Sequence, residues 1–450
     1  MTDIASAWSA LGGDPALLAR VAAVVRPGVL QARLPVRPLA RACVGACALA
    51  AAELGARRAG LAEVPRVTVD DGAVATAFTS ERQLLVDGRA PMTFAPLSRF
   101  WRTSDGWVRT HANYPHHTAR LLSALGVGDD HARVAAALAE RPAREIEEAV
   151  YAAGGLAVAV RTPEEWLPVP GPLVETERLG AAHARVLPSP AGTPLLPAAG
   201  VRVLDLTRVI AGPVATRTLA LLGADVLRVD PPGLPELPDQ HADTGFGKRS
   251  TTLDATSDRF AELLGAADVV VTGYRPGALD RLGLSPAALA ARRPGLIVVQ
   301  LSAWGTDGPW GGRRGFDSLV QAATGIAAVE GSPEQPGALP AQALDHGTGY
   351  LLAAAVLRAL TERSYDGQGR LVRLSLARTA AWLLAGRAAA EEAGEAYDGP
   401  EAWLAQADSP IGRLRYARSP VGFDGGPADW ARPPGVWGAD EARWEGASEE

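Results

Sequence analysis

The segment that decides the fold is residues 201–232, VRVLDLTRVIAGPVATRTLALLGADVLRVDPP. Its apolar stretch 201–206 predicts a strand, and Pro213 stands where proline is favoured, at the first position of a helix. We expect that helix to end at Gly223 and a second strand to cover 225–229. Strand, helix and strand in this order predict a unit of a parallel sheet.

The same alternation continues downstream. A helix near 256–266 precedes DVVVT (268–272), and LIVVQLS (296–302) predicts a further strand. Short, nearly continuous apolar strands separated by helices indicate an α/β fold whose parallel sheet is covered on both faces. No G-x-G-x-x-G or G-x-x-x-x-G-K-[ST] pattern follows the first strand, so dinucleotide-binding and P-loop interpretations lack a physical basis.

Composition narrows the class of protein. The chain has 450 residues, of which 47% are hydrophobic, and 44 basic residues stand against 50 acidic ones. This balance favours a globular protein and argues against nucleic-acid or polybasic membrane binding. Cys43 and Cys47 lie four residues apart in an Ala-rich run, which predicts buried apolar side chains and no disulfide framework. With no signal-like N-terminus and no long uninterrupted apolar run, we expect a cytoplasmic chain without a membrane span.

Four regions follow from the composition along the chain. We expect a helical and polar-aromatic region over 1–190, a linker over 191–200, the sheet domain over 201–384 and an irregular tail over 385–450. An internal echo links LPVRPLA (34–40) with LPAQALD (339–345), each followed by an Ala-rich helix and a strand-like segment at 66–69 or 371–374. Ala40 then stands where the second copy has Asp345. The echo is either a degenerate partial copy or a coincidence between two Ala-rich stretches.

Asp345 is the most informative single residue. It follows an apolar run, lies beside two glycines and precedes a helix expected to begin near Thr348. Aspartate there is typical of a helix N-cap. It is equally suited to be a nucleophilic carboxylate that the helix dipole keeps ionised. Among the basic residues, Lys248 is the only lysine. Either its position suits an ammonium group better than a guanidinium group, or this lysine has survived by chance.

Several segments resemble the family III CoA-transferases, the CaiB/BaiF group that includes formyl-CoA transferase. They are residues 201–232, GKRSTTLD (247–254), ADVVVTGYRPGALDRLGL (267–284) and LSAWGTDGPW…GFDSLVQAATG (301–325), in the family's order. The resemblance implies a Rossmann-like parallel sheet with flanking helices plus a smaller α+β domain. It also implies that Asp345 is the catalytic residue. The CoA contacts that it implies are Arg208, Ile210, Ala211, Lys248, Arg249, Tyr274, Arg275, Gly277 and Leu279.

The implied reaction moves CoA from an acyl-CoA to a carboxylic acid. The Asp345 carboxylate attacks the thioester to give a mixed anhydride, CoA thiolate converts it to an aspartyl thioester, and the acceptor carboxylate collects the CoA. Backbone N–H groups near glycines such as Gly347 are expected to stabilise the oxyanions. CoA acts as a co-substrate, and no metal or other cofactor is implied.

The N-terminal region resembles the same family out of order. FWRTSDGWVRTHANYPHHTARLLSALG (100–126) and RTPEEW (161–166) resemble the small domain that normally follows the sheet domain, and SPVGF…PPGVWG (419–438) resembles the family's terminal segment. The simplest account of this order is a fusion or rearrangement in which a catalytically degenerate partial copy precedes the active one. The family implies a homodimer, and whether the N-terminal region completes the site within one chain or across a dimer stays open.

Two other functions compete with CoA transfer. Racemases of the same family use a His in a Gly-His-Asp segment, whereas this chain has Gly315-Phe316-Asp317, and phenylalanine cannot exchange a proton. His346 is the candidate to replace that histidine. A non-catalytic acyl-CoA-binding protein is the third alternative. The clustered His111, His116 and His117 lack a third zinc ligand at a suitable spacing and are interpreted as polar surface or substrate-pocket residues.

Overall fold

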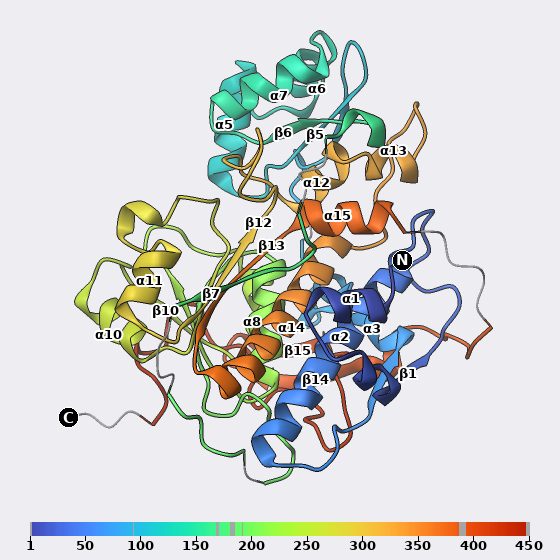
Figure 1. Cartoon of the computed structure of the whole chain (residues 1–450). Coiled ribbons are helices and arrows are strands. Elements are labelled where there is room, and N and C mark those ends of the chain that lie inside the picture. The colour runs from blue at the N-terminus through green and yellow to red at the C-terminus, as the bar shows by residue number, and fades with distance from the viewer. Residues whose placement is uncertain are drawn as a thin grey trace.

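The computed structural model describes residues 2–92, 94–167, 171–180, 185–190, 192–386 and 393–446. A large sheet with its helices forms the main body, and a small α+β unit sits at the top of the view in Figure 1. An N-terminal layer of helices packs along the side of the main body.

The main sheet has seven strands in the order β10-β9-β8-β11-β12-β13-β7. Their bounds are β7 Glu175–Leu179, β8 Arg202–Leu206, β9 Asp225–Asp230, β10 Arg249–Thr252, β11 Val269–Thr272, β12 Ile297–Ser302 and β13 Gly369–Ser375. All pairs are parallel except β13 with β7. The six parallel strands follow the Rossmann order, so the chain reverses direction across the sheet between β8 and β11, where such folds bind ligands.

The strands expected at 201–206, 225–229, 268–272 and 296–302 are confirmed as β8, β9, β11 and β12. The strand-like segment 371–374 is β13. Two strands of this sheet, both at its edges, were missed. Arg249–Thr252 forms β10 with the polar sequence RSTT, and Glu175–Leu179 forms β7 with the charged sequence ETERL, so neither carries an apolar run. Helix α8 (Ala211–Leu221) begins two residues before Pro213.

The two faces of the sheet bury different helices because successive side chains of a strand point to opposite sides. On one face, side chains such as Val203, Val271 and Val299 pack with α8 and α14 (Ala343–Asp366). On the other, side chains such as Leu204 and Val270 pack with α10 (Asp258–Ala266) and α11 (Pro286–Arg292). The remaining helical elements of the main body are α9 Pro238–Thr244, η3 Asp280–Leu282, α12 Asp317–Ala323, α13 Ile326–Glu330 and α15 Leu376–Leu384.

The small unit has its own sheet and its own core. Its elements are β4 Phe100–Arg102, β5 Trp107–Thr110, α5 Pro115–Leu125, α6 His131–Ala139, α7 Ala143–Ala152, β6 Ala157–Ala159 and η2 Pro163–Glu165. The three strands are antiparallel, and leucines and valines of α5 to α7 close a separate apolar cluster. The unit contacts the main body through α12 and through the rings of Trp166, Trp304 and Trp310. This is the smaller α+β domain expected from the resemblance.

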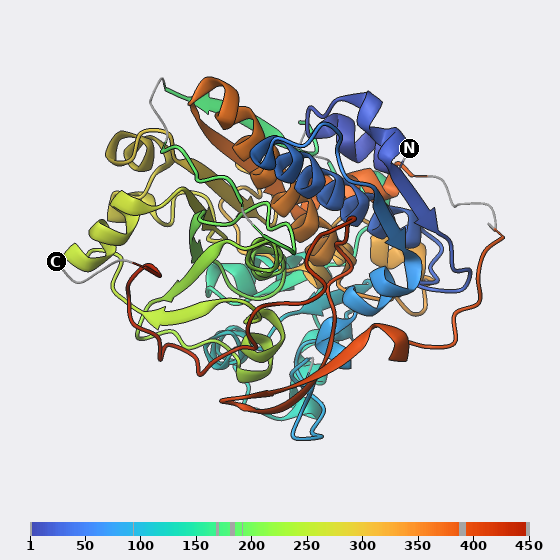
Figure 2. The ribbon, with the colours of Figure 1, turned by 90° about the horizontal axis from the view of Figure 1, so that it is seen from below.

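The N-terminal layer is built around one long helix. Its elements are α1 Ile4–Ala10, η1 Pro15–Arg20, β1 Val21–Val24, α2 Val36–Ala59, β2 Val67–Asp70, α3 Asp71–Ala77, α4 Ser80–Gln83 and β3 Leu85–Val86. Helix α2 lies along α14, as the blue and orange helices show in Figure 2. By length and composition α2 is apolar enough to cross a membrane, a feature that a count of uninterrupted apolar residues does not reveal. However, 89% of its most apolar 18-residue window is buried inside the protein. Cys43 and Cys47 are buried in it and unbonded, as expected.

The C-terminal region is more regular than expected. After η4 (Glu401–Trp403), the strands β14 (Leu404–Ser409) and β15 (Gly412–Ala417) form a hairpin that pairs with β3, so an irregular tail is wrong for 404–417. Further on, the indoles of Trp430, Trp437 and Trp444 donate hydrogen bonds to the main body. Residues 387–392 and 447–450 of the expected tail, and Ala191 of the expected linker, lie outside the described residues.

Candidate active site

A cavity opens at the carboxyl ends of β8, β11 and β12, between the main sheet and the small unit. This is the switch point at which the topology predicts ligand binding. Five of the ten predicted site residues line it: Arg208, Ala211, Tyr274, Arg275 and Asp345. The small unit contributes Tyr114, His116 and His117, so residues from 1–190 complete the cavity within one chain.

Asp345 lies in the first turn of α14 and is 6% exposed. The helix begins at Ala343 with Gln342 as its N-cap, so a helix starting near Thr348 and a capping role for Asp345 are both wrong. The cap comes instead from another segment: the N–H groups of Leu344 and Asp345 both donate to Oδ2 of Asp317, each over 2.9 Å. Because Asp317 satisfies these amides, the Asp345 carboxylate is left facing the cavity.

The electrostatics of Asp345 differ from the expectation for a helix N-terminus. Burial, the charge of Asp317 and the charge of Glu81 raise its pKa well above the usual value. Burial also raises the pKa of Asp317, although hydrogen bonds from Asp345 N–H and Gln321 oppose the change. Within the described part of the chain, the Asp345 carboxylate has no hydrogen bond or ion pair of its own. The prediction that the helix dipole keeps it ionised is therefore wrong, because the amides nearest to it serve Asp317.

The glycines after Asp345 serve helix packing. A Cβ at Gly349 would come within 2.6 Å of the Ala211 carbonyl oxygen on α8, and one at Gly347 within 3.0 Å of Leu39 on α2. Gly347 is also inside α14, where its N–H faces the helix's own preceding turn. Its expected role as an oxyanion donor thus finds no support in its position.

The β8–α8 turn is held by a buried carboxylate that the sequence did not reveal. Glu236 accepts hydrogen bonds from Tyr114 Oη over 2.6 Å and from Arg228 over 2.9 Å, and pairs with Arg208 over 3.3 Å. Although burial acts in the opposite direction, Arg228 and Arg208 lower the pKa of Glu236 to about 2. In the same turn Val209 has φ of +72°, a strained conformation for a β-branched residue. Strain of this kind is concentrated at functional sites, where surrounding contacts enforce it.

The cavity wall carries cations suited to phosphates. Arg275, Arg281 and Arg314 line it, and none has an acidic partner among the described residues. Burial and the proximity of Arg275 lower the pKa of Arg314, as expected for like charges brought together. Uncompensated guanidinium groups in a cavity favour an anionic ligand such as a diphosphate.

The structure does not bring the other predicted CoA contacts into this cavity. Lys248 is buried, and its Nζ donates to Asp205 and to the Pro213 carbonyl, each over 3.0 Å. Arg249 pairs with Asp225 over 2.6 Å and reaches the carbonyl of Arg443. Ile210 packs in the apolar core. In this structure Lys248 therefore braces the β8–α8 turn, and Arg249 ties the C-terminal segment to β9.

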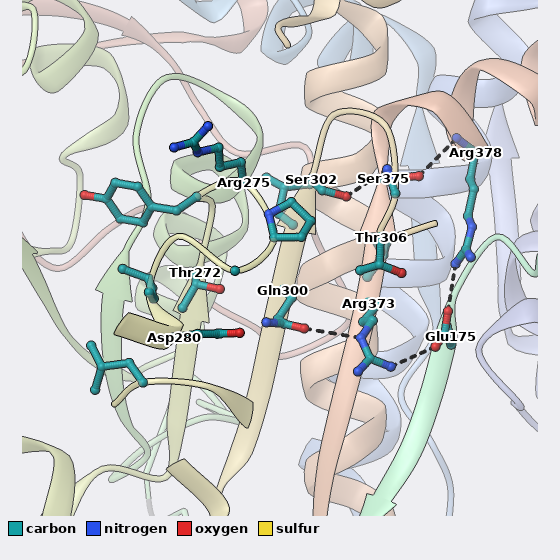
Figure 3. A pocket seen from close by; sticks show the side chains of 18 residues that line it. Glu175, Thr272, Arg275, Asp280, Gln300, Ser302, Thr306, Arg373, Ser375 and Arg378 are labelled. Carbon is teal, nitrogen blue, oxygen red and sulfur yellow. Dashed lines mark hydrogen bonds and ion pairs between the residues drawn. The ribbon is translucent and has the colours of Figure 1, made fainter. Parts of the chain in front are cut away.

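Gly277 and Leu279 line a neighbouring cavity over the ends of β11, β12 and β13, shown in Figure 3. Its floor is a polar row in which Arg373 bridges Gln300 and Glu175, and Arg378 also pairs with Glu175. These ion pairs fasten the antiparallel strand β7 to the sheet. Tyr274 and Arg275 line both cavities and so form the wall between them.

Of the clustered histidines, His116 and His117 line the cavity, and His111 is buried against Phe316. The ring of His111 stacks on Phe316 with centroids 3.7 Å apart, and His117 meets Phe316 edge-on at 5.7 Å. Burial and nearby His116 lower the pKa of His117 to about 3, so this ring is neutral near pH 7. No group of three metal-ligating side chains occurs in the portion of the chain that the structure describes.

The fold and the site together define an α/β protein with an arginine-lined cavity at a Rossmann switch point and a buried carboxyl group inside it. The family model described as CoA-transferase family III matches residues 198–435, which is more than half of the chain. The chain therefore belongs to CoA-transferase family III.

Relatives match over part of their length. "Probable fatty acyl-CoA transferase Rv3272" of Mycobacterium tuberculosis is 37% identical over 205 residues, covering 42% of this chain and 52% of the relative. A formyl-CoA:oxalate CoA-transferase of Streptomyces coelicolor is 34% identical over 193 residues, covering 39% and 47%. Among solved structures, a CaiB/BaiF family protein from Brucella suis is 26% identical with a TM-score of 0.37, covering 48% of this chain and 65% of that one. The chain spans about half the length of the curated relatives it matches.

Proposed function

We propose that this protein transfers CoA from an acyl-CoA to a carboxylic acid, with Asp345 as the nucleophile. The observation that carries the proposal is the placement of Asp345. Among the described residues its carboxyl group has no partner, and it opens onto a cavity whose wall bears arginines without an acidic partner, in a chain of CoA-transferase family III. The arginines suit the phosphates of CoA, and the carboxyl group suits attack on the thioester.

The transfer balances without a metal or redox cofactor. The ionised Asp345 carboxylate adds to the thioester carbonyl, and the C–S bond breaks to give an aspartyl–acyl anhydride and CoA thiolate. The thiolate then attacks the aspartyl carbonyl, which releases the acyl carboxylate and leaves an aspartyl thioester. The acceptor carboxylate attacks this thioester, and CoA thiolate closes the cycle on the resulting anhydride to give the new acyl-CoA and free Asp345.

The raised pKa of Asp345 gives this mechanism a pH signature. The nucleophile is the ionised form, and burial, Asp317 and Glu81 disfavour that form. A carboxylate with a raised pKa is a stronger nucleophile once it is ionised. We expect kcat to rise with pH through the raised pKa of Asp345 and then to level off.

The racemase alternative is weakened by the position of His346. Its ring is fully buried, and its Nε2 lies 3.2 Å from Oε2 of Glu81, away from the cavity lining. Phe316 occupies the place of the racemase histidine and stacks on His111. Neither residue is therefore placed to exchange a proton with an α-carbon in the cavity.

Replacement of Asp345 tests the proposal. Asp345→Asn is expected to lower CoA transfer at least about 1000-fold while changing CoA affinity less than about tenfold, because the arginines remain. Hydroxylamine trapping of the wild type with acyl-CoA, followed by peptide mass spectrometry, should mark Asp345. The exposed Asp129→Asn is the matched control. Full transfer by Asp345→Asn, or α-deuterium exchange without transfer, would contradict the proposal, and binding with neither activity would support a non-catalytic binder.

The assembly and location of the protein are further parts of this proposal. A homodimer in the cytoplasm is the expectation that follows from the family resemblance and the sequence. The contribution of Tyr114, His116 and His117 to the same cavity as Asp345 supports a complete site in each chain, whichever oligomer forms. Light scattering of the purified protein measures that oligomeric state.

A further inference from the structure

Glu81, in the N-terminal layer, lies outside the segment matched by the family model and reaches the catalytic helix. It stands on the short helix α4, and its carboxylate Oε2 lies 3.2 Å from Nε2 of His346, the residue after Asp345. His346 is fully buried, and its ring lies against that of Phe78 with centroids 5.3 Å apart. The His346 side chain is thus fixed by two residues of the N-terminal layer.

The first turn of α14 is consequently held from two sides. Asp317 on α12 accepts the backbone N–H groups of Leu344 and Asp345, while Glu81 on α4 holds the side chain of His346. Both anchors are carboxylates, and three acidic groups from distant parts of the chain converge here. Asp345 is the one of the three whose carboxylate faces the cavity without a partner among the described residues.

We propose that Glu81 is a positioning residue of the active site, which fixes the first turn of α14 through His346. The charge of Glu81 also contributes to the raised pKa of Asp345. This inference rests on the proposed role of Asp345 and adds to it a requirement for the N-terminal layer. The layer is then more than a cover for α14, because it supplies one of the charges that tune the nucleophile.

The surroundings single out Glu81 and Asp317 as the charged groups that act on Asp345. Near the start of α14, the neighbours from α2 are Leu39 and Cys43, and those from α8 and α15 are Val214 and Thr379. Burial raises the pKa of the Cys43 thiol, so it is uncharged near neutral pH. Arg82, 3.6 Å from Oε1 of Glu81, is the cation beside the pair, and its side chain is 43% exposed. Removal of the Glu81 charge therefore changes one of two acidic influences on Asp345.

Two substitutions separate position from charge. Glu81→Gln keeps an oxygen that accepts a hydrogen bond from His346 and removes the charge, so the acid limb of the kcat–pH profile should move to lower pH. The plateau at high pH should stay within about threefold of the wild type. Glu81→Ala removes both the hydrogen-bond acceptor and the charge. The nucleophile is then less well placed, so kcat on the plateau should fall about tenfold while KM for acyl-CoA changes little. Glu63→Gln, an exposed carboxylate of the same layer that pairs with Arg20, is the control.

A chemical readout keeps this test separate from the proposed transfer. A water-soluble carbodiimide modifies protonated carboxyl groups, so the pH at which labelling of Asp345 is half lost, read by peptide mass spectrometry, should also be lower in Glu81→Gln. If Glu81 had a purely structural role, its replacement would lower Tm without moving the midpoint of the acid limb of the kcat–pH profile or the labelling midpoint. Unchanged midpoints and unchanged kcat in folded Glu81→Gln and Glu81→Ala overturn the inference. If Asp345→Asn still transfers CoA, the proposed function fails, while the labelling midpoint still reports on Glu81.

Discussion

Two regions of the molecule have the same order of elements but different surroundings. In the first, α2 leads to β2 and α3; in the second, α14 leads to β13 and α15. Each long helix has 24 residues and ends at a left-handed glycine, and each following short helix is capped by a side chain, Asp70 or Ser375. Glu53 and Arg358, 305 residues apart and equivalent in this register, form an ion pair across the α2–α14 contact over 2.6 Å. Equivalent residues that meet one another are typical of packing about a two-fold axis, and the two segments share one order of elements.

The difference between the regions lies at the start of the long helix. Asp345 opens onto a cavity formed by the ends of parallel strands, whereas Ala40, its counterpart, is fully buried. The first region has a two-stranded sheet, β1 with β2, and so lacks the switch point that makes the cavity. The comparison teaches that the repeated scaffold does not by itself make a site; the neighbouring strands and Asp317 do.

The largest expected effect comes from moving the carboxylate between the two regions. The double variant Asp345→Asn, Ala40→Asp should remain at least about 1000-fold below the wild type in CoA transfer, no better than Asp345→Asn alone. Position 40 has no access to the cavity. A carboxyl group buried there without a partner should also lower the free energy of unfolding by roughly several kcal/mol. Transfer assays at matched folded fractions, from circular dichroism, provide the measurement. Any recovery of transfer would show that the first region can present a nucleophile.

Lys248 provides the next largest effect and decides between two roles. The family resemblance implied a CoA contact, but the structure buries its ammonium against Asp205, which is fully buried. Lys248→Met should lower the free energy of unfolding by about 3–5 kcal/mol, because it leaves the Asp205 carboxylate buried without its cation. Urea denaturation checks this. Arg259→Met, which breaks an exposed pair with Glu262, is the control and should cost about 0.5 kcal/mol or less. A loss of CoA affinity at unchanged stability would restore the contact role.

Much of the main sheet could be predicted from sequence because its central strands are uninterrupted apolar runs, as in DVVVT at 268–272. The edge strands β10 and β7 and the C-terminal hairpin could not, because these strands carry polar residues that a loop also carries. The switch point followed from strand order, which needs the tertiary structure.

The candidate site was predicted unevenly for a similar reason. Asp345, Arg208, Tyr274 and Arg275 belong to contiguous motifs and line the cavity together. The residues that tune Asp345 come from far along the chain: Asp317 is 28 residues from it, and Glu81 is 265 residues from His346. No spacing rule connects such positions. The direction of a side chain is also hidden in a linear pattern, which is why Lys248 and Arg249 were expected at the ligand and lie elsewhere.

The glycines near the start of α14 sharpen the comparison, because α2 has side chains at the equivalent positions. Their replacement should have an effect of intermediate size. Gly349 corresponds to Val44 of α2, and the absence of a side chain lets α8 approach α14. Gly349→Ala should lower the free energy of unfolding by about 1–3 kcal/mol, because the new Cβ would lie 2.6 Å from the Ala211 carbonyl oxygen and a backbone must move. Gly347→Ala should cost less, since its nearest neighbour is the flexible end of Leu39 at 3.0 Å. Urea unfolding curves measure both, and an equal cost would contradict the packing difference.

The smallest expected effect is a gain of stability when the nucleophile is removed. Burial, Asp317 and Glu81 raise the pKa of folded Asp345, so between its unfolded and folded pKa the native state holds a proton that the unfolded state has lost. The protonated Asp345 therefore contributes its full stabilisation below the unfolded pKa of about 4. This contribution to the free energy of unfolding is lost as pH rises through the folded pKa. Asp345→Asn does not titrate, so its free energy of unfolding should exceed that of the wild type increasingly at higher pH, by about 1.4 kcal/mol for each unit of pKa displacement.

The equivalent position in the first region provides the comparison. Ala40 has no charge to remove, so a neutral substitution at position 40 should give no pH-dependent gain in the free energy of unfolding. Urea denaturation from pH 4 to 9, with Asp129→Asn as the exposed control, measures the difference, and a wild type that matches Asp345→Asn at every pH would show that Asp345 is not held in an unfavourable environment.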